Sequence, residues 1–224
     1  MPEIRPYREA DLEDLYRICL ATGDAGGEAS HLYADPKILG HVFAAPYGVL
    51  SPRTAFVVED DEGVGGYVLG ALDTQAFEAM AEERWWPKLR ASYADPGPAP
   101  EEGWSRDQLM AWVIHHPRRT SRRIADPYPS HVHIDLLPRL QGRGLGRRML
   151  DLWFETLRDM GSTGVHLGVA PSNARAIRFY RAYGLIEPPA AQGVLWFARG
   201  FGSSGGASAS SLQPIGSGPH QPGR

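Results

Sequence analysis

Residues 137–150, LPRLQGRGLGRRML, place alternating glycines and four arginines directly before an apolar segment of helical spacing. Glycine lets a phosphate oxygen approach the main chain without a Cβ in the way. The first N–H groups of a helix have no partner within it, and the helix dipole favours an anion there. The stretch therefore predicts a phosphate-binding turn, and a turn that only packs a strand on a helix is the alternative.

Three phosphate-binding patterns compete for this stretch. A P-loop ends in Gly-Lys-Ser/Thr, but Gly146 is followed by Arg147. A dinucleotide fingerprint needs a later glycine where Arg147 stands, and no long series of strand–helix–strand units follows. The third pattern, Gln/Arg-x-x-Gly-x-Gly/Ala, is matched by Gln141, Gly144 and Gly146.

The third pattern resembles the coenzyme A pyrophosphate loop of the GCN5-related N-acetyltransferases (GNAT). A second motif, NARAIRFYRAYG, resembles the unit that follows this loop in the same family. Its Asn173 and Tyr180 are two helical turns apart, so they lie on one helix face. Over roughly residues 3–199, segments such as WWPKLRASYADP and YPSHVHIDLLP resemble the acetyltransferase-like C-terminal domain of animal O-GlcNAcase and its free-standing bacterial relatives.

This resemblance implies a GNAT fold of the α/β (α+β) class, a mixed central sheet flanked by helices, with acetyl-CoA as cosubstrate. Direct transfer of acetyl to an amine acceptor is the expected activity. A catalytically inactive acyl-CoA-binding module is the alternative, since the animal domain is often regarded as a pseudo-acetyltransferase. The residues expected to hold the coenzyme are Leu136, Leu137, Gln141, Gly142, Arg143, Gly144, Leu145, Gly146, Arg147, Asn173 and Tyr180.

The resemblance also implies how these residues act. Two strands, HIDLLP and VHLGV, are expected to splay apart around the pantetheine arm, which pairs with main-chain groups at Leu136 and Leu137. A main-chain N–H there would stabilise the thioester oxygen as it gains charge. Tyr180 is expected to protonate the departing thiolate. Asn173 would bind the pantetheine or position groups beside the sulfur.

The group that takes the amine's proton stays open at this stage. Strand alternation puts His131, His133 and Asp135 on one face. A buried carboxylate is costly unless it is paired or used, so Asp135 and Asp73 are candidates to hold or deprotonate the acceptor, and capping of a neighbouring helix or loop is an equal alternative. The His-x-His pair shows no third ligand, so no metal site is predicted.

Periodicity predicts the elements that position these residues. A short strand is followed by a helix that begins at an acidic cap, Asp11, and buries Cys19. A hairpin turns at Gly63. Two helices are expected after the glycine stretch and around NARAIRFYRAYG, the first closed by Gly161 with Leu152 on its apolar stripe. The second is expected to be capped by Ser172 or Asn173, to end at Gly184, and to precede a last strand, GVLWFARG.

Residues 74–129 form a predicted insertion near the acceptor site, with helical pieces at about 75–91 and 105–115 around a loop rich in proline and glycine. Trp85 and Trp86 either wall the acceptor pocket or only pack the insertion. The basic run HHPRRTSRR is interpreted as a solvated face. The predicted domain covers 1–199, and the Gly/Ser-rich segment 200–224 is expected to be disordered.

Composition limits the classes of partner. The chain has 224 residues, a net charge of −3 and one cysteine. A negative net charge disfavours nucleic acid, a single cysteine excludes an internal disulfide, and no apolar run is long enough for a membrane span. We therefore expect a cytoplasmic monomer or homodimer that binds acetyl-CoA and an amine, with no nucleic-acid or membrane partner.

Overall fold

The central feature of the fold, in a computed structural model that describes residues 1–188 and 194–202, is one six-stranded sheet with the order β1-β2-β3-β4-β5-β6. All neighbours pair antiparallel except β4 and β5, which are parallel. The mixed sheet predicted from the sequence is thus confirmed. The strands are β1 (Glu3–Pro6), β2 (Phe56–Asp60), β3 (Gly63–Ala71), β4 (Ser130–Leu136), β5 (Gly164–Val169) and β6 (Leu195–Gly200).

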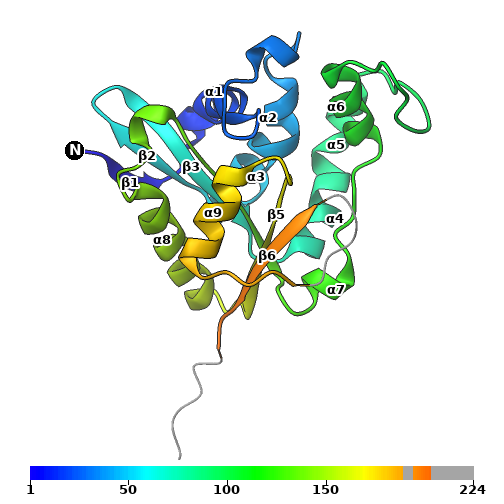
Figure 1. The fold of residues 1–224 in the computed structure, drawn as a ribbon. Helices are drawn as coiled ribbons and strands as arrows, with labels where there is room; N and C mark the ends of the chain where they lie inside the picture. Colours follow the sequence, from blue (N-terminus) through cyan, green and yellow to red (C-terminus); the bar gives the residue numbers. More distant parts are fainter. Residues whose placement is uncertain (189–193, 203–224) are drawn as a thin grey trace, which may run out of the picture.

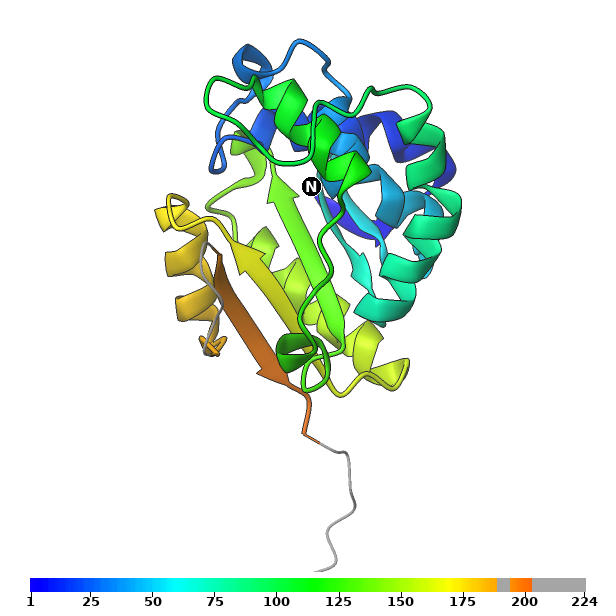
Figure 2. The same cartoon turned by 90° about the vertical axis from the view of Figure 1, so that its right-hand side faces the viewer.

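The two parallel strands share only a short stretch of pairing. Ser130 lies opposite Val165 and His131 opposite His166, and the recorded register stops there. Beyond these pairs β4 and β5 diverge toward their carboxyl ends, as Figure 2 shows. We call the gap between the diverging strands the wedge. In the described part of the chain, main-chain groups of both strands have no sheet partner on that side.

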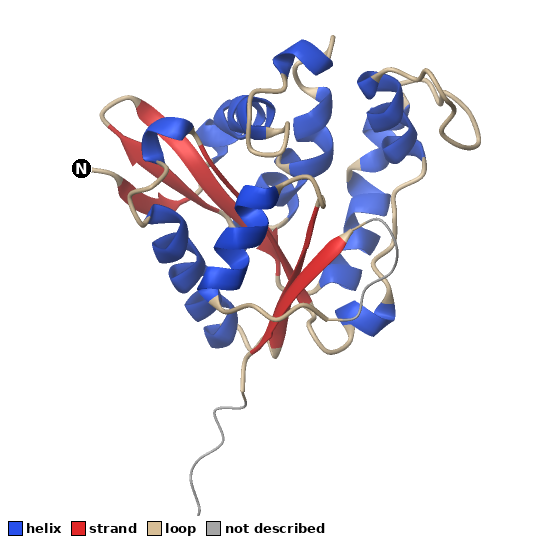
Figure 3. Ribbon diagram, in the orientation of Figure 1, coloured by secondary structure: helices blue, strands red, loops and turns tan. Residues whose placement is uncertain are grey.

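Helices cover both faces of the sheet (Figures 1 and 3). On one face, α8 (Leu145–Asp159) and α9 (Ala174–Tyr183) pack on the strands. The other face and its flank carry α1 (Leu12–Thr22), α2 (Ile38–Phe43), α3 (Ala45–Leu50), α4 (Thr74–Arg84), α5 (Trp86–Arg90) and α6 (Arg106–His115). The short α7 (Arg122–Ala125) and four 3-10 turns, Glu9–Asp11, Ser30–Leu32, Pro52–Thr54 and Pro138–Leu140, complete the described elements.

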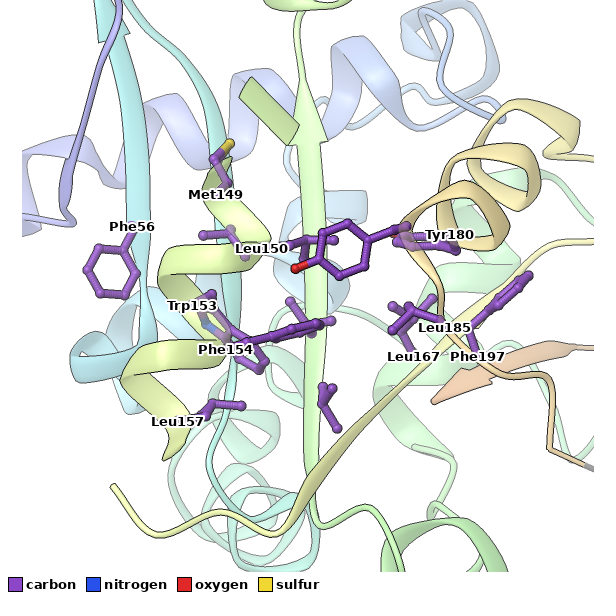
Figure 4. Close-up of a cluster of buried hydrophobic side chains, with 14 of the residues drawn as sticks. Phe56, Met149, Leu150, Trp153, Phe154, Leu157, Leu167, Tyr180, Leu185 and Phe197 are labelled. Atoms are coloured by element: carbon purple, nitrogen blue, oxygen red, sulfur yellow. The ribbon is translucent and has the colours of Figure 1, made fainter. Parts of the chain in front are cut away.

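Strand alternation divides the core between the two faces. In the central hairpin, Val58 and Val68 pack toward α8, whereas Val57 and Leu69 pack toward α1 and α3. The face toward α8 is closed by a helical stripe of large side chains (Figure 4). Its fully buried members are Met149, Leu150, Trp153, Phe154 and Leu157.

Two details of the sequence prediction need correction. Leu152, expected on the apolar stripe of α8, is only partly buried. Asp11 does not cap α1 with its side chain. Its carboxylate instead accepts the Arg8 main-chain N–H at 2.7 Å and pairs with the Arg5 guanidinium at 2.7 Å, because the chain turns back after β1 and brings Asp11 against that strand.

The ends of the glycine-flanked helices agree with the sequence prediction. Asn173 is the N-cap of α9, and its side chain accepts the Ala176 N–H at 3.0 Å. Gly184 ends that helix with φ +93°, and Gly161 follows α8 with φ +86°, a region that L side chains rarely adopt. These ends fix where β4, α8 and α9 meet.

The insertion and the C-terminal boundary differ in part from expectation. The first helical piece is divided into α4 and α5 at Trp85, since Pro87 has no N–H to extend the hydrogen bonds of α4 and lies in the first turn of α5. Gly200 belongs to β6, and Phe201 is buried with its N–H bound to the Thr163 carbonyl at 2.8 Å. The folded domain therefore extends past residue 199, and residues 203–224 of the expected tail lie outside the described residues. No helix in the described ranges is long and apolar enough to span a membrane.

Candidate active site

The glycine stretch forms a turn between β4 and α8 that only glycine accommodates without strain at two positions. Gly142 has φ +72° and Gly144 has φ +74°, and an added Cβ at either would meet no atom within 4 Å. Gly144 is also the N-cap of α8. A Cβ on Gly146 would lie 3.3 Å from the Phe179 ring, so this glycine lets α8 and α9 approach closely. The first two glycines therefore serve the shape of the turn and the third serves packing.

The turn ends in a row of free donors. The Arg148 N–H binds the Gly144 carbonyl at 3.2 Å and begins the helical ladder. Among the described residues, the main-chain N–H groups of Leu145, Gly146 and Arg147 have no such partner, as expected for a helix N-terminus. Together with the helix dipole, these donors form an anion-binding cradle.

A cavity of about 410 Å³ opens from this cradle, and we call it the glycine-loop cavity. It brings together predicted residues from β4, the loop, α8 and α9, together with Thr22 at the end of α1 and Gly26 beyond it. The predicted residues that line it are Asp135, Leu136, Gln141, Gly142, Gly144, Leu145, Gly146, Arg147, Asn173 and Tyr180. Leu137, Arg143 and Asp73 are not among the lining residues.

The main chain of β4 corrects the expectation for Leu137. Its N–H donates to the Gly65 carbonyl at 2.8 Å, so β3 already satisfies it. Since main-chain groups alternate in direction along a strand, those of Ile134 and Leu136 face the wedge instead. The Leu136 carbonyl accepts the Gln141 side-chain amide at 2.6 Å. The N–H groups of Ile134 and Leu136 are thus the donors presented to a molecule in the wedge.

Three of the polar residues around the cavity already have protein partners. Besides its bond to Leu136, Gln141 accepts a hydrogen bond from Arg175. Arg147 donates to the Ala182 carbonyl at 3.2 Å, with its guanidinium 4.9 Å from the Tyr183 ring centroid. Asn173 uses its side-chain oxygen as the cap of α9 and keeps its amide N–H groups for another partner. These contacts hold the loop and the two helices in one arrangement.

Tyr180 projects from α9 toward β4 (Figure 4). The residue is 7% exposed, and its hydroxyl makes no hydrogen bond to another described residue. Burial raises the pKa of Tyr180 above its ordinary value, and the nearby Asp135 carboxylate adds to the rise. The phenol therefore keeps its proton at neutral pH and is free to donate it into the cavity.

A wedge between parallel strands beside a glycine turn at a helix N-terminus agrees with the resemblance found in the sequence. The model of the "Acetyltransferase (GNAT) family" matches residues 6–185. The chain belongs to this family.

Individual GNAT relatives extend the comparison. The crystal structure of SsHAT is 37% identical and superposes with a TM-score of 0.83, covering 89% of this chain and 98% of that one. The protein O-GlcNAcases of Rattus norvegicus and Mus musculus are each 25% identical over 82% of this chain but only 20% of theirs, so the chain spans about a fifth of these curated relatives. The fold is shared with yncA of Salmonella typhimurium, solved with acetyl-CoA, at 16% identity and a TM-score of 0.51, covering 93% of this chain and 99% of that one.

The two carboxylates considered from the sequence have different surroundings in this GNAT fold. Asp135 points to the α1 side of β4 and accepts the Tyr67 hydroxyl at 2.8 Å. Burial raises the pKa of Asp135 to about 6, against the lowering effect of that hydrogen bond. Asp73 is exposed and caps α4 by accepting the Ala76 N–H at 2.9 Å. The structure thus supports the capping alternative for Asp73 and leaves Asp135 as the carboxylate at the cavity.

A second cavity, of about 260 Å³, lies on the other side of the wedge and was not predicted as a unit from the sequence. We call it the histidine cavity because His131 and His133 of β4 meet His166 of β5 there. Aromatic side chains from four elements line it as well, namely Tyr47, Phe77, Trp86 and Trp196. The alternation in HVH predicted that His131 and His133 lie on one face of β4. That Tyr47 of α3 and His166 of β5 join them depends on the tertiary fold.

The insertion contributes one of its two adjacent tryptophans to this cavity. Trp86 lines it, whereas Trp85 turns away and donates its indole N–H to the His41 carbonyl at 2.9 Å. Arg118 and Arg119, from the basic run interpreted as a solvated face, are exposed but also border the cavity. The insertion therefore contributes one wall of the histidine cavity.

Hydrogen bonds fix the tautomer of each cavity histidine. The Thr74 hydroxyl donates to the Pro129 carbonyl at 2.7 Å, so it accepts from His131 Nδ1–H at 2.9 Å. With His131 neutral, its Nε2 accepts the Tyr47 hydroxyl at 2.9 Å, and the Tyr47 oxygen then accepts His133 Nε2–H at 3.0 Å. His166 donates Nδ1–H to the Tyr128 carbonyl at 2.6 Å. Among the described residues, this series of hydrogen bonds leaves His133 Nδ1 and His166 Nε2 without a proton and without a partner.

Burial keeps all three histidines uncharged. It lowers the pKa of His133 to about 4, with a smaller contribution from His166. Burial and the two neighbouring histidines hold the pKa of His131 well below its usual value, and burial lowers that of His166 too. The cavity is therefore polar but carries no positive charge on its histidines at neutral pH.

Proposed function

We propose that the chain is an acetyl-CoA-dependent acetyltransferase that transfers acetyl directly to an amine. The observation that carries the proposal is the pair of cavities on β4: the glycine-loop cavity with its anion cradle, and the histidine cavity across the wedge. The cradle suits a pyrophosphate, since its free N–H groups and its left-handed glycines leave the main chain bare. The wedge suits an extended, amide-bearing arm.

The residues of the glycine-loop cavity take distinct roles in this proposal. The N–H groups of Leu145, Gly146 and Arg147 hold the pyrophosphate, and those of Ile134 and Leu136 pair with the pantetheine arm. One of the strand N–H groups also stabilises the carbonyl oxygen of the thioester as it gains charge. Acetyl-CoA supplies an activated acyl group, so no further cofactor is needed.

Tyr180 is the proposed general acid. Tyr180 is a buried residue that lines the glycine-loop cavity, and its protonated hydroxyl makes no hydrogen bond to another described residue. The departing thiolate gains the phenolic proton, and solvent later restores it. Asn173 is placed to bind the coenzyme arm through its remaining amide N–H groups.

Calorimetry and a thiol-release assay test this function together. Acetyl-CoA is titrated into the protein, and release of free coenzyme A is then followed with a panel of primary amines. We expect saturable one-to-one binding and amine-dependent release of thiol, with the acetylated amine identified by mass spectrometry. Binding without transfer to any amine would instead indicate a non-catalytic acyl-CoA-binding module. Failure to bind acetyl-CoA at millimolar concentration would contradict both the acetyltransferase and the acyl-CoA-binding module.

A further inference from the structure

The geometry points to the histidine cavity as the site of a small, weakly basic amine such as an aromatic amine, with His133 as the base that takes its proton. This inference rests on the proposed acetyl transfer and adds the class of acceptor and the identity of the base. It is carried by the position of the cavity, by the charges around it and by the hydrogen-bond chain through Tyr47.

The position of the cavity places an acceptor opposite the coenzyme. His133 sits on β4 directly before Ile134, whose main chain faces the wedge. Past His131, β4 has separated from β5, so the wedge joins the two sides of the sheet at this point. An amine in the histidine cavity therefore approaches the thioester from the side that the coenzyme does not occupy.

The charges around the cavity disfavour a cation. Glu78 is the one carboxylate among the described residues that line it, and it already accepts the Thr120 N–H at 2.8 Å and faces Arg119 at 3.9 Å. Arg118 and Arg119 add positive charge at the border. The stretches 189–193 and 203–224, which the structure does not describe, contain no Asp or Glu in the sequence. A buried ammonium group would thus meet a single carboxylate that is already hydrogen-bonded, so its charge would be poorly compensated, which is costly.

The walls favour a flat, apolar body. Tyr47 and Phe77 stack with ring centroids 4.5 Å apart, and Trp86 and Trp196 complete the aromatic lining. A volume of about 260 Å³ is below the range of about 300–1,000 Å³ typical of pockets for drug-sized ligands. The cavity therefore fits a small amine with one aromatic ring better than a long polyamine or a peptide segment.

The hydrogen-bond chain orients His133 for proton transfer. Because Tyr47 accepts His133 Nε2–H, the bare Nδ1 is the nitrogen available to the acceptor. The amine nitrogen forms a bond to the thioester carbonyl carbon, and the carbon–sulfur bond breaks. The amine proton goes to His133 Nδ1, and the thiolate takes the Tyr180 proton. His133 is a weak base because burial lowers its pKa to about 4, and it suits a weakly basic nitrogen whose proton becomes acidic during attack.

A matched pair of amines tests the class of acceptor. Aniline and benzylamine are similar in size, but at pH 7.5 aniline is neutral and benzylamine is a cation; agmatine serves as a longer dication. With background rates subtracted, we expect kcat/KM for aniline to exceed that for benzylamine by about tenfold or more, the effect of about 1.4 kcal/mol. A preference for benzylamine or agmatine would overturn the inference and leave the proposed acetyl transfer standing. No transfer to any amine despite bound acetyl-CoA would overturn both.

Substitution of His133 tests the base. We expect His133→Gln to lower kcat for aniline by roughly 10²-fold or more, with the acetyl-CoA dissociation constant and the melting temperature close to those of the wild type. His31→Gln, at the exposed surface, is the control, and His166→Gln, in the same cavity, should lower kcat less than His133→Gln does. Equal losses in His133→Gln and His166→Gln would remove the specific role of His133.

The tautomer gives a readout that does not depend on activity. Long-range ¹H–¹⁵N spectra of the wild type should show His133 protonated at Nε2 and bare at Nδ1. Tyr47→Phe removes the oxygen that accepts this proton, so the His133 signals should shift to a mixture of tautomers and kcat should fall with an unchanged KM for acetyl-CoA. A wild-type His133 protonated at Nδ1 would contradict the proposed base.

Discussion

Substitution of Gly144 by Asp should abolish acetyl-CoA binding while leaving the protein folded. At φ +74° an L residue is strained by about 1 kcal/mol, and an added Cβ meets no atom within 4 Å. For a domain of this size, such a cost lowers the melting temperature by about 2–4 °C. The fold therefore tolerates the change.

The effect on binding is larger because the new carboxylate stands at the N-cap of α8. A carboxylate about 5 Å from one phosphate charge is repelled by about 3 kcal/mol at an effective dielectric constant of 20. This repulsion corresponds to a loss of roughly 10²-fold in affinity for each phosphate charge that close. With two phosphates in the pyrophosphate, the expected result is the absence of measurable binding.

Gly144→Asn is the matched control, since it has the same backbone strain and a similar size without the charge. Calorimetry should give Gly144→Asn an affinity within about tenfold of the wild type, and circular dichroism should show all three proteins folded. Wild-type affinity in a folded Gly144→Asp protein would refute the anion cradle. Equal losses in both variants would show that shape rather than charge governs this position.

Three further predictions address the acid, the buried carboxylate and the N-terminal ion pair. Tyr180→Phe should lower kcat by roughly 10²- to 10⁴-fold without changing acetyl-CoA affinity; an unchanged kcat contradicts the acid role. The pKa of Asp135 is raised to about 6, so the stability that its protonated form provides is lost as pH rises through 6. In urea unfolding, the free energy of unfolding of Asp135→Asn relative to that of the wild type should therefore rise by about 2 kcal/mol from pH 4.5 to pH 7.5. A difference that does not change with pH would refute this. The Arg5 guanidinium holds the pKa of Asp11 below its usual range, so Arg5→Met should cost about 3 kcal/mol at pH 7, with a smaller loss below pH 4; a constant loss argues against the ion pair.

The sequence predicted the glycine turn and the two helices around it well because the signals for these features are local. A left-handed glycine, a helix cap such as Asn173 and an apolar stripe on a helix each depend on residues a few positions apart. The spacing from Gly144 to Tyr180 then placed both on one cavity. The sequence did not show which main-chain groups of β4 face the wedge. Leu137 was assigned to the wedge, although its N–H donates to the Gly65 carbonyl of β3.

The histidine cavity could not be assembled from the sequence because its residues come from distant segments. Tyr47, on a helix that the sequence analysis did not predict, meets His131 and His133 more than 80 positions away. His166 is the one polar residue in β5, GVHLGV, so the pattern of that strand indicates only burial. The sequence directed attention to carboxylates, whereas the bare nitrogens of the cavity became visible only from the hydrogen bonds that fix each imidazole.

The central claim, that this chain holds acetyl-CoA in the wedge with its pyrophosphate on the turn before α8, is tested most directly by a crystal structure of the acetyl-CoA complex. The structure should place pyrophosphate oxygens within about 3 Å of the N–H groups of Leu145, Gly146 and Arg147. The thioester should lie between β4 and β5, with its sulfur near the Tyr180 hydroxyl. Acetyl-CoA bound elsewhere, with the wedge beside Ile134 and Leu136 empty, would contradict the account.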